Sequence, residues 1–134
     1  MATQFGDFTH VHAFTAAMTR KDLEAMLVHM ADDVVLRTPL AAEPLRGKPA
    51  IRPVVQALLD VVDRFEFREY LEGPEHVASF FTVQVGPNAI DGMDYWRVDA
   101  AGVIREMTVL WRPFPAVAAV VARLDRAAAP AAGA

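Results

Sequence analysis

Residues 93–98 read Met-Asp-Tyr-Trp-Arg-Val, a run whose aromatic and aliphatic side chains are typical of a β-strand. Successive side chains of a strand point to opposite faces, so Asp94 shares a face with Trp96 and Val98. A carboxylate among such neighbours is costly unless it is paired, hydrogen-bonded or protonated. Asp94 is therefore a candidate acid, base or ligand anchor. The structural alternative is a buried carboxylate that other protein groups satisfy.

This run lies in a predicted hairpin, with strands over Ala89–Asp99 and Val103–Phe114. Residues 100–102, Ala-Ala-Gly, suit the turn between them because glycine readily takes a positive φ. Two earlier strands are expected over Phe65–Tyr70 and Val77–Val85, each bounded by residues that favour turns. The second half of the chain is therefore predicted to form antiparallel strands.

Apolar residues recur at three- and four-residue spacing in segments predicted to be helical: Phe8–Met18, Lys21–Met30, Pro53–Val62 and Pro115–Arg126. Between the second and third helices we expect a strand over Val34–Leu40 and a loop over Ala41–Lys48. Most of the helices precede the run of strands. This order predicts an α+β fold in which helices pack on one face of a curved sheet.

The composition predicts one globular domain, since 54% of the 134 residues are hydrophobic and 22% are charged. We expect the domain to cover residues 1–126 and a low-complexity Ala/Pro tail to cover residues 127–134. The net charge of −4 argues against binding to nucleic acid or to an anionic membrane, because both usually need a basic surface. The chain has no cysteine, which excludes disulfides and thiolate chemistry.

Targeting signals are not visible in the sequence. The first residues lack a basic region followed by an apolar stretch, and no uninterrupted apolar run is long enough to span a bilayer. We therefore expect a soluble cytoplasmic protein with neither a nucleic-acid nor a membrane partner.

Several short stretches, taken in order, resemble one known group of proteins. They are Lys-Asp-Leu-Glu-Ala-Met at 21–26, Ala-Asp-Asp-Val-Val-Leu at 31–36, Leu-Arg-Gly-Lys-Pro-Ala-Ile at 45–51 and the hairpin over 93–111. Together they resemble the NTF2-like superfamily, in particular its SnoaL-like and ketosteroid-isomerase-like branch. The resemblance runs from Phe8 to Phe114 and is more specific for a fold than for an activity.

The resemblance implies a cone-shaped α+β roll, in which about four helices pack on a curved antiparallel sheet and enclose a pocket. It also implies a homodimer formed through the outer face of the sheet. Thr108 and Leu110 alternate with Met107 and Val109 along the last strand, which makes them the candidate dimer contacts.

This chain has matching residues at only some of the catalytic positions of ketosteroid isomerases. Their carboxylate base precedes a proline on the first strand, where this chain has Thr38, and their tyrosine on the first helix is Phe14 here. Asp94 matches their second, protonated acid, and Trp111 matches a tryptophan of the pocket. Neither Thr38 nor Phe14 can replace the group that it stands for, so steroid isomerisation by that mechanism is not expected.

The predicted site is an apolar pocket beside Asp94, which is the only catalytic candidate. The predicted ligand-binding residues are Phe14, Thr38, Phe81, Asp94, Trp96, Met107, Val109 and Trp111. We expect no metal and no cofactor, because the resemblance to SnoaL-type cyclases implies chemistry by a pocket acid alone. Arg97 lies at an odd offset from Asp94, which places it on the opposite face and disfavours the Asp-Arg-Asp arrangement of limonene-epoxide-hydrolase relatives.

Three functions remain open at this point. The first is binding of a small apolar molecule, with Asp94 as the polar anchor. The second is a cofactor-free enzyme, similar to polyketide cyclases, isomerases or epoxide hydrolases, that uses Asp94 as general acid/base. The third is a dimeric interaction module without a ligand.

Overall fold

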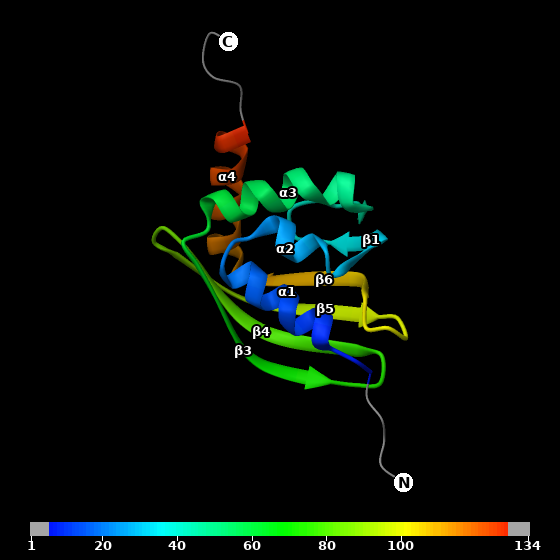
Figure 1. Ribbon diagram of the computed structural model, residues 1–134. Coiled ribbons are helices and arrows are strands. Elements are labelled where there is room, and N and C mark those ends of the chain that lie inside the picture. Colours follow the sequence, from blue (N-terminus) through cyan, green and yellow to red (C-terminus); the bar gives the residue numbers. More distant parts are fainter. Residues whose placement is uncertain (1–5, 129–134) are drawn as a thin grey trace.

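A computed structural model describes residues 6–128, which form helices on one side of a curved sheet (Figure 1). The elements in chain order are α1 (Thr9–Thr19), α2 (Leu23–Leu27), β1 (Met30–Arg37), β2 (Leu45–Arg46), α3 (Lys48–Val61), β3 (Arg64–Glu72), β4 (His76–Val85), β5 (Asn88–Val98), β6 (Ile104–Arg112) and α4 (Phe114–Ala128). This is the cone-shaped α+β roll that the sequence predicts. No helix within residues 6–128 is long and apolar enough to cross a membrane.

The six strands form one sheet in the order β2-β1-β6-β5-β4-β3. Neighbouring strands are antiparallel except β1 and β6, which pair in parallel. The strands from β3 to β6 form a continuous meander, and β1 joins its end from the first half of the chain (Figure 1). The sheet is therefore mixed, although most of its pairs are antiparallel as expected.

The hydrophobic core lies between the helices and the inner face of the sheet. Its largest fully buried side chains are Trp96, Phe14, Phe81, Ile51, Ile90 and Ile104. Alternate residues of β4 and β5 are buried, which is the period-two pattern of strands with one face on the core. Helix α1 crosses the inner face of the sheet, and α4 packs against α3 and the end of the β5–β6 hairpin (Figure 1).

Two predicted helices have different bounds in the structure. The second was expected over residues 21–30, but α2 ends at Leu27 and Met30 already begins β1. The third was expected to start at Pro53, whereas α3 starts at Lys48 with Pro49 in its first turn and Pro53 inside the helix. A proline in the first turn loses no intrahelical hydrogen bond, so Pro49 is the residue that suits the helix start.

The predicted strand over residues 34–40 was also shifted. Strand β1 ends at Arg37, and the hydroxyl of Thr38 accepts a hydrogen bond from the amide N–H of Leu40 at 3.1 Å, which turns the chain away from the sheet. Leu45 and Arg46, expected in a loop, form the short strand β2 against β1. Helix α4 continues to Ala128, into the predicted tail, and residues 129–134 of that tail lie outside the described residues.

Candidate functional site

A cavity of about 40 Å³ lies between helices α1–α3 and the inner face of the sheet. Its wall is almost entirely aliphatic and aromatic. Among the described residues that line it, Thr38 is the only hydroxyl-bearing side chain, and none carries a charge. Four flexible thioether side chains contribute to the wall: Met18, Met26, Met30 and Met107. The cavity is therefore suited to an apolar occupant.

The structure brings together most of the residues that were predicted to bind a ligand. Those that line the cavity are Phe14, Thr38, Phe81, Met107, Val109 and Trp111. Asp94 and Trp96 belong to the same inner face of the sheet, but they are not part of the cavity wall. Thr108 and Leu110 lie on the opposite face of β6, as their alternation with Met107 and Val109 predicts.

Asp94 lies directly beside the wall of the cavity. In the sheet register it is opposite Ser79 of β4 on one side and Val109 of β6 on the other. Residues paired in this way have Cβ atoms about 5 Å apart, so one cross-strand step separates Asp94 from the cavity-lining Val109. Its strand neighbours on the inner face are Gly92 and Trp96. A side chain at Gly92 would overlap the Phe81 ring, which therefore lies against the sheet next to Asp94.

The Asp94 carboxyl is completely buried, and neither of its oxygens has a hydrogen-bond partner among the described residues. Burial raises the pKa of Asp94 well above its ordinary value, because the charged form loses its hydration in these surroundings. The neutral acid is consequently favoured. A protonated carboxyl donates one hydrogen bond through its O–H and accepts through its other oxygen.

Two further polar side chains are buried next to Asp94. The Trp96 indole Nε1 has no acceptor in the part of the chain that the structure describes. Its ring packs edge-on against Phe14, with centroids 6.2 Å apart. The Ser79 hydroxyl donates to the carbonyl oxygen of Phe80 at 3.3 Å, near the long limit for a hydrogen bond. Ser79 was not among the predicted site residues, although its alternation with Phe81 in the predicted strand over 77–85 places it on the inner face.

A surface depression of about 520 Å³ lies between residues 37–44 and strand β6. Thr38, Val109 and Trp111 line both this depression and the internal cavity. These three side chains therefore form a wall that the cavity and the depression share. We call this depression, which is lined by residues 37–39, 41–44 and 108–111, the mouth.

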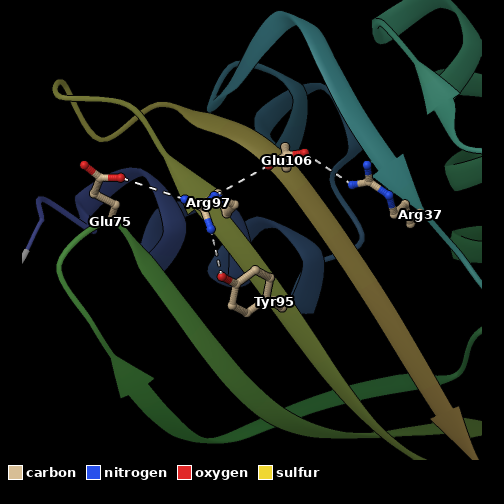
Figure 2. Close-up of polar contacts among 5 residues, drawn as sticks. All are labelled: Arg37, Glu75, Tyr95, Arg97 and Glu106. Atoms are coloured by element: carbon tan, nitrogen blue, oxygen red, sulfur yellow. Dashed lines mark hydrogen bonds and ion pairs between the residues drawn. The ribbon is translucent and has the colours of Figure 1, made fainter.

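Arg97 lies on the outer face of the sheet, away from Asp94, as its offset in the sequence predicts. Figure 2 shows that its guanidinium points toward Tyr95, Glu75 and Glu106. Its Nη1 donates to the Tyr95 hydroxyl at 3.3 Å, its Nη2 is 3.9 Å from Glu75 Oε2, and its Nε is 3.6 Å from Glu106 Oε2. Glu106 also pairs with Arg37 at 3.3 Å. Within residues 6–128, Asp94 therefore has no arginine partner of the kind that an Asp-Arg-Asp site needs.

A histidine pair lies outside the cavity wall. Nδ1 of His10 in α1 is 3.0 Å from Nδ1 of His29, which directly precedes β1. Burial and the nearby His10 lower the pKa of His29. At this distance one ring donates and the other accepts, so the pair links α1 to the start of the sheet.

Comparison with known proteins identifies the family. Residues 11–107 match the model of the SnoaL-like domain, and the chain belongs to this family. It is similar to a steroid delta-isomerase from Pseudomonas aeruginosa, at 25% identity over 92% of this chain and 95% of that one, with a TM-score of 0.78.

Two more solved structures have the same fold. A bacterial protein with a cystatin-like fold from Silicibacter pomeroyi DSS-3 is 22% identical over 91% of this chain and 86% of that one, with a TM-score of 0.80. The epoxide hydrolase/cyclase-like enzyme SalBIII, which acts in pyran ring formation in the polyether salinomycin, is 16% identical over 77% of this chain and 88% of that one, with a TM-score of 0.67. Their likeness to this chain concerns the fold.

Proposed function

We propose that this protein binds a small apolar molecule in the cavity between its helices and its sheet, with Asp94 as the polar anchor. The observation that carries the proposal is the contrast between the apolar wall of the cavity and the buried carboxyl of Asp94 beside it. The cavity wall has one hydroxyl, at Thr38, and no charge among the described residues, while the buried carboxyl lies one cross-strand step behind Val109. Such a site rewards a ligand that buries apolar surface and satisfies one polar group.

The size of the cavity sets a condition on this proposal. A dry cavity of about 150 Å³ binds benzene in a protein core, and the cavity described above, at about 40 Å³, is much smaller. A ring-sized ligand therefore needs movement of the wall. Met18, Met26, Met30 and Met107 supply it, because the unbranched methionine side chain changes rotamer readily and adapts to irregular shapes.

The mouth is the proposed route of entry. It shares the side chains of Thr38, Val109 and Trp111 with the cavity wall. Rotation of these side chains connects the two spaces without breaking a strand pair of the sheet. Trp111 is the largest of the three and half-buried, so its rotamer controls the width of the opening.

The binding proposal is tested with a matched pair of variants. Val109→Phe adds volume to the wall that the mouth and the cavity share, whereas Leu71→Phe places the same side chain at a half-exposed position of β3 that lines neither. We expect indane and naphthalene, followed by ligand-observed NMR, to bind the wild type and Leu71→Phe alike, and to bind Val109→Phe about tenfold more weakly. Circular dichroism and thermal unfolding check that both variants fold. Equal binding to all three proteins, or no binding to the wild type, would contradict the proposal.

A cofactor-free enzyme is the second candidate. It is supported by an acid whose neutral form is favoured beside a cavity, and by the similarity to a protein named as a steroid delta-isomerase. Thr38 and Phe14 both line the cavity, but neither supplies a carboxylate base or a phenol. We therefore propose general-acid chemistry at Asp94 for this candidate. Loss of turnover in a folded Asp94→Asn variant supports it, and binding without turnover of polyketide, terpenoid and epoxide substrates opposes it.

We also propose a homodimer formed through the outer face of the sheet, which is compatible with either function and with a pure interaction module. Phe80, Met93 and Leu110 form one cross-strand row there. Phe80 is 40% exposed and Leu110 is 56% exposed. In the sheet register, Arg97 and Glu106 lie on one side of this row, and Asp91 and Arg112 lie on the other. An apolar row between charged borders is the anatomy of a protein interface.

A further inference from the structure

A second apolar space lies beside the cavity, at the surface between α3 and α4 (Figure 1). We call it the α3–α4 groove, and its volume is about 270 Å³. Its apolar lining comes from one face of each helix and from one loop residue: Pro53, Val54, Ala57, Val121, Leu124 and Leu40. Asp125 is the only charged residue of the lining in the part of the chain that the structure describes. Proline and alanine have short side chains, so α3 leaves space opposite the larger side chains of α4.

Two side chains belong to both spaces. Leu40 and Val54 line the cavity as well as the α3–α4 groove, so they form a wall that the two spaces share. Val54 is part of α3, and its β-branched side chain is stiff. Leu40 lies in the turn after β1, where its amide N–H donates to the Thr38 hydroxyl, and its side chain has several staggered rotamers. Rotation of Leu40 is therefore the movement that would connect the cavity with the groove.

We propose that the cavity and the α3–α4 groove together bind one ligand that has an unbranched alkyl chain. The inference rests on the proposed binding function and adds the ligand class. The polar end of this ligand lies at the sheet side of the cavity, where Val109 is paired with Asp94. The alkyl chain runs from there past Leu40 to the helix side and ends in the groove.

The sizes of the two spaces favour a chain over a ring. The cavity, at about 40 Å³, is much smaller than the cavity of about 150 Å³ that holds benzene in a protein core. A ring has to fit into one space as a whole. An alkyl chain is only one CH₂ group wide, so it distributes its volume over the cavity and the groove and passes between them beside a single rotated side chain.

The packing of α4 allows a chain to lie between the two helices. Val120 is fully buried, and Val117 and Leu124 pack against the core while partly buried. Contacts between alkyl groups are non-directional, so they form again when α4 shifts slightly or when an alkyl chain takes the place of a neighbouring side chain. Each CH₂ group that enters the groove is then removed from water, which favours binding.

The first experiment measures the affinity of the wild type for 1-hexanol, 1-octanol, 1-decanol and 1-dodecanol by isothermal titration calorimetry. Burial of one CH₂ group strengthens binding about fourfold. We therefore expect the affinity to rise about fourfold for each added CH₂ group while the chain extends into the groove, and to level off once its end reaches solvent. An affinity that is the same for all four alcohols would refute the inference.

A matched pair of variants places the alkyl chain in the groove. Ala57→Phe fills the groove at a position that does not line the cavity, whereas Ala118→Phe adds the same ring at an exposed position of α4 that lines neither space. Ala57→Phe should bind 1-hexanol within about twofold of the wild type and 1-decanol at least about tenfold more weakly. Ala118→Phe should bind both alcohols like the wild type. Circular dichroism and thermal unfolding check the fold, and equal binding of 1-decanol to wild type and Ala57→Phe would overturn the inference.

A second measurement needs no variant, which matters if Ala57→Phe does not fold. Intermolecular nuclear Overhauser effects report which protein methyl groups lie near the terminal methyl group of 1-decanol bound to the wild type. We expect contacts with Val121 and Leu124, which line the groove and not the cavity. Contacts of the terminal methyl group with residues of the cavity wall alone would refute the inference.

The outcomes distinguish this inference from the proposed function. If neither the alcohols nor indane and naphthalene bind the wild type, both the proposed function and the inference are wrong. If the ring compounds bind and the affinity for the alcohols does not depend on chain length, the apolar site stands and its extension into the groove is refuted.

Discussion

The substitution Asp94→Asn replaces a fully buried carboxyl by an amide of nearly the same shape, and its effect should depend on pH. Burial raises the pKa of Asp94 in the folded protein, whereas in the unfolded chain it titrates near its ordinary value of about 3.9. Below that value both states hold the proton, and the full stability is present. As the pH rises above it, only the unfolded chain releases the proton, so the wild-type free energy of unfolding falls.

The size of this effect follows from proton linkage. Each pH unit between the unfolded and the folded pKa lowers the wild-type free energy of unfolding by about 1.4 kcal/mol. The loss stops where the pH passes the folded pKa. An asparagine has no such proton, so the variant lacks this slope. Its free energy of unfolding, relative to that of the wild type, should therefore increase with pH.

Urea unfolding of both proteins at several values between about pH 4 and pH 8 measures the difference directly. Asp91→Asn is the matched control, since Asp91 lies on the same strand, its side chain is 51% exposed, and it pairs with Arg112 and Arg68. A difference between wild type and Asp94→Asn that stays constant over this range would refute the reasoning. A variant that is most destabilised at high pH would refute it equally.

Three further outcomes follow from the packing. Met107→Ala should lower the free energy of unfolding by about 2–5 kcal/mol and tighten the binding of ligands larger than indane. Thermal unfolding with and without ligand measures both effects. Unchanged stability would place Met107 outside the core. Leu110→Asp should turn a dimer into a monomer in sedimentation equilibrium with the fold intact, whereas a monomeric wild type would rule out the proposed dimer. Arg97→Ala should change the free energy of unfolding of the monomer by less than about 1 kcal/mol in urea titrations, because its ion pairs are about half-exposed; a loss of several kcal/mol would contradict this.

The sequence predicted those parts of the fold that depend on local patterns. The β5–β6 hairpin follows from alternation and from the turn at Gly102, whose φ of +83° glycine adopts without strain. The same alternation correctly predicted that Met107 and Val109 share one face and that Arg97 lies on the other. Met30 was assigned to a helix because an apolar residue fits the end of a helical stripe and the start of a strand equally well, and only tertiary pairing decides between them.

Features that depend on contacts between distant segments could not be predicted from local sequence patterns. The parallel pairing of β1 with β6 joins the two halves of the chain, and no local signal indicates it. The pairing of Ser79 with Asp94 depends on the register of β4 and β5, which a strand assignment leaves open. The unpartnered Trp96 Nε1 is likewise visible only when all neighbouring side chains are placed.

Pro39 has a consequence for how this family member could change its ligand range. The β1–β6 ladder ends at the pair Arg37 and Thr108, and β6 continues to Arg112 without β1 beside it, still paired with β5. Pro39 cannot donate a backbone hydrogen bond, so it prevents β1 from extending beside β6 over the mouth. The mouth therefore lies where β6 extends beyond the end of β1. Substitutions of Pro39 would therefore alter the mouth without touching the buried polar groups of β5, so ligand access and ligand anchoring can change separately in evolution.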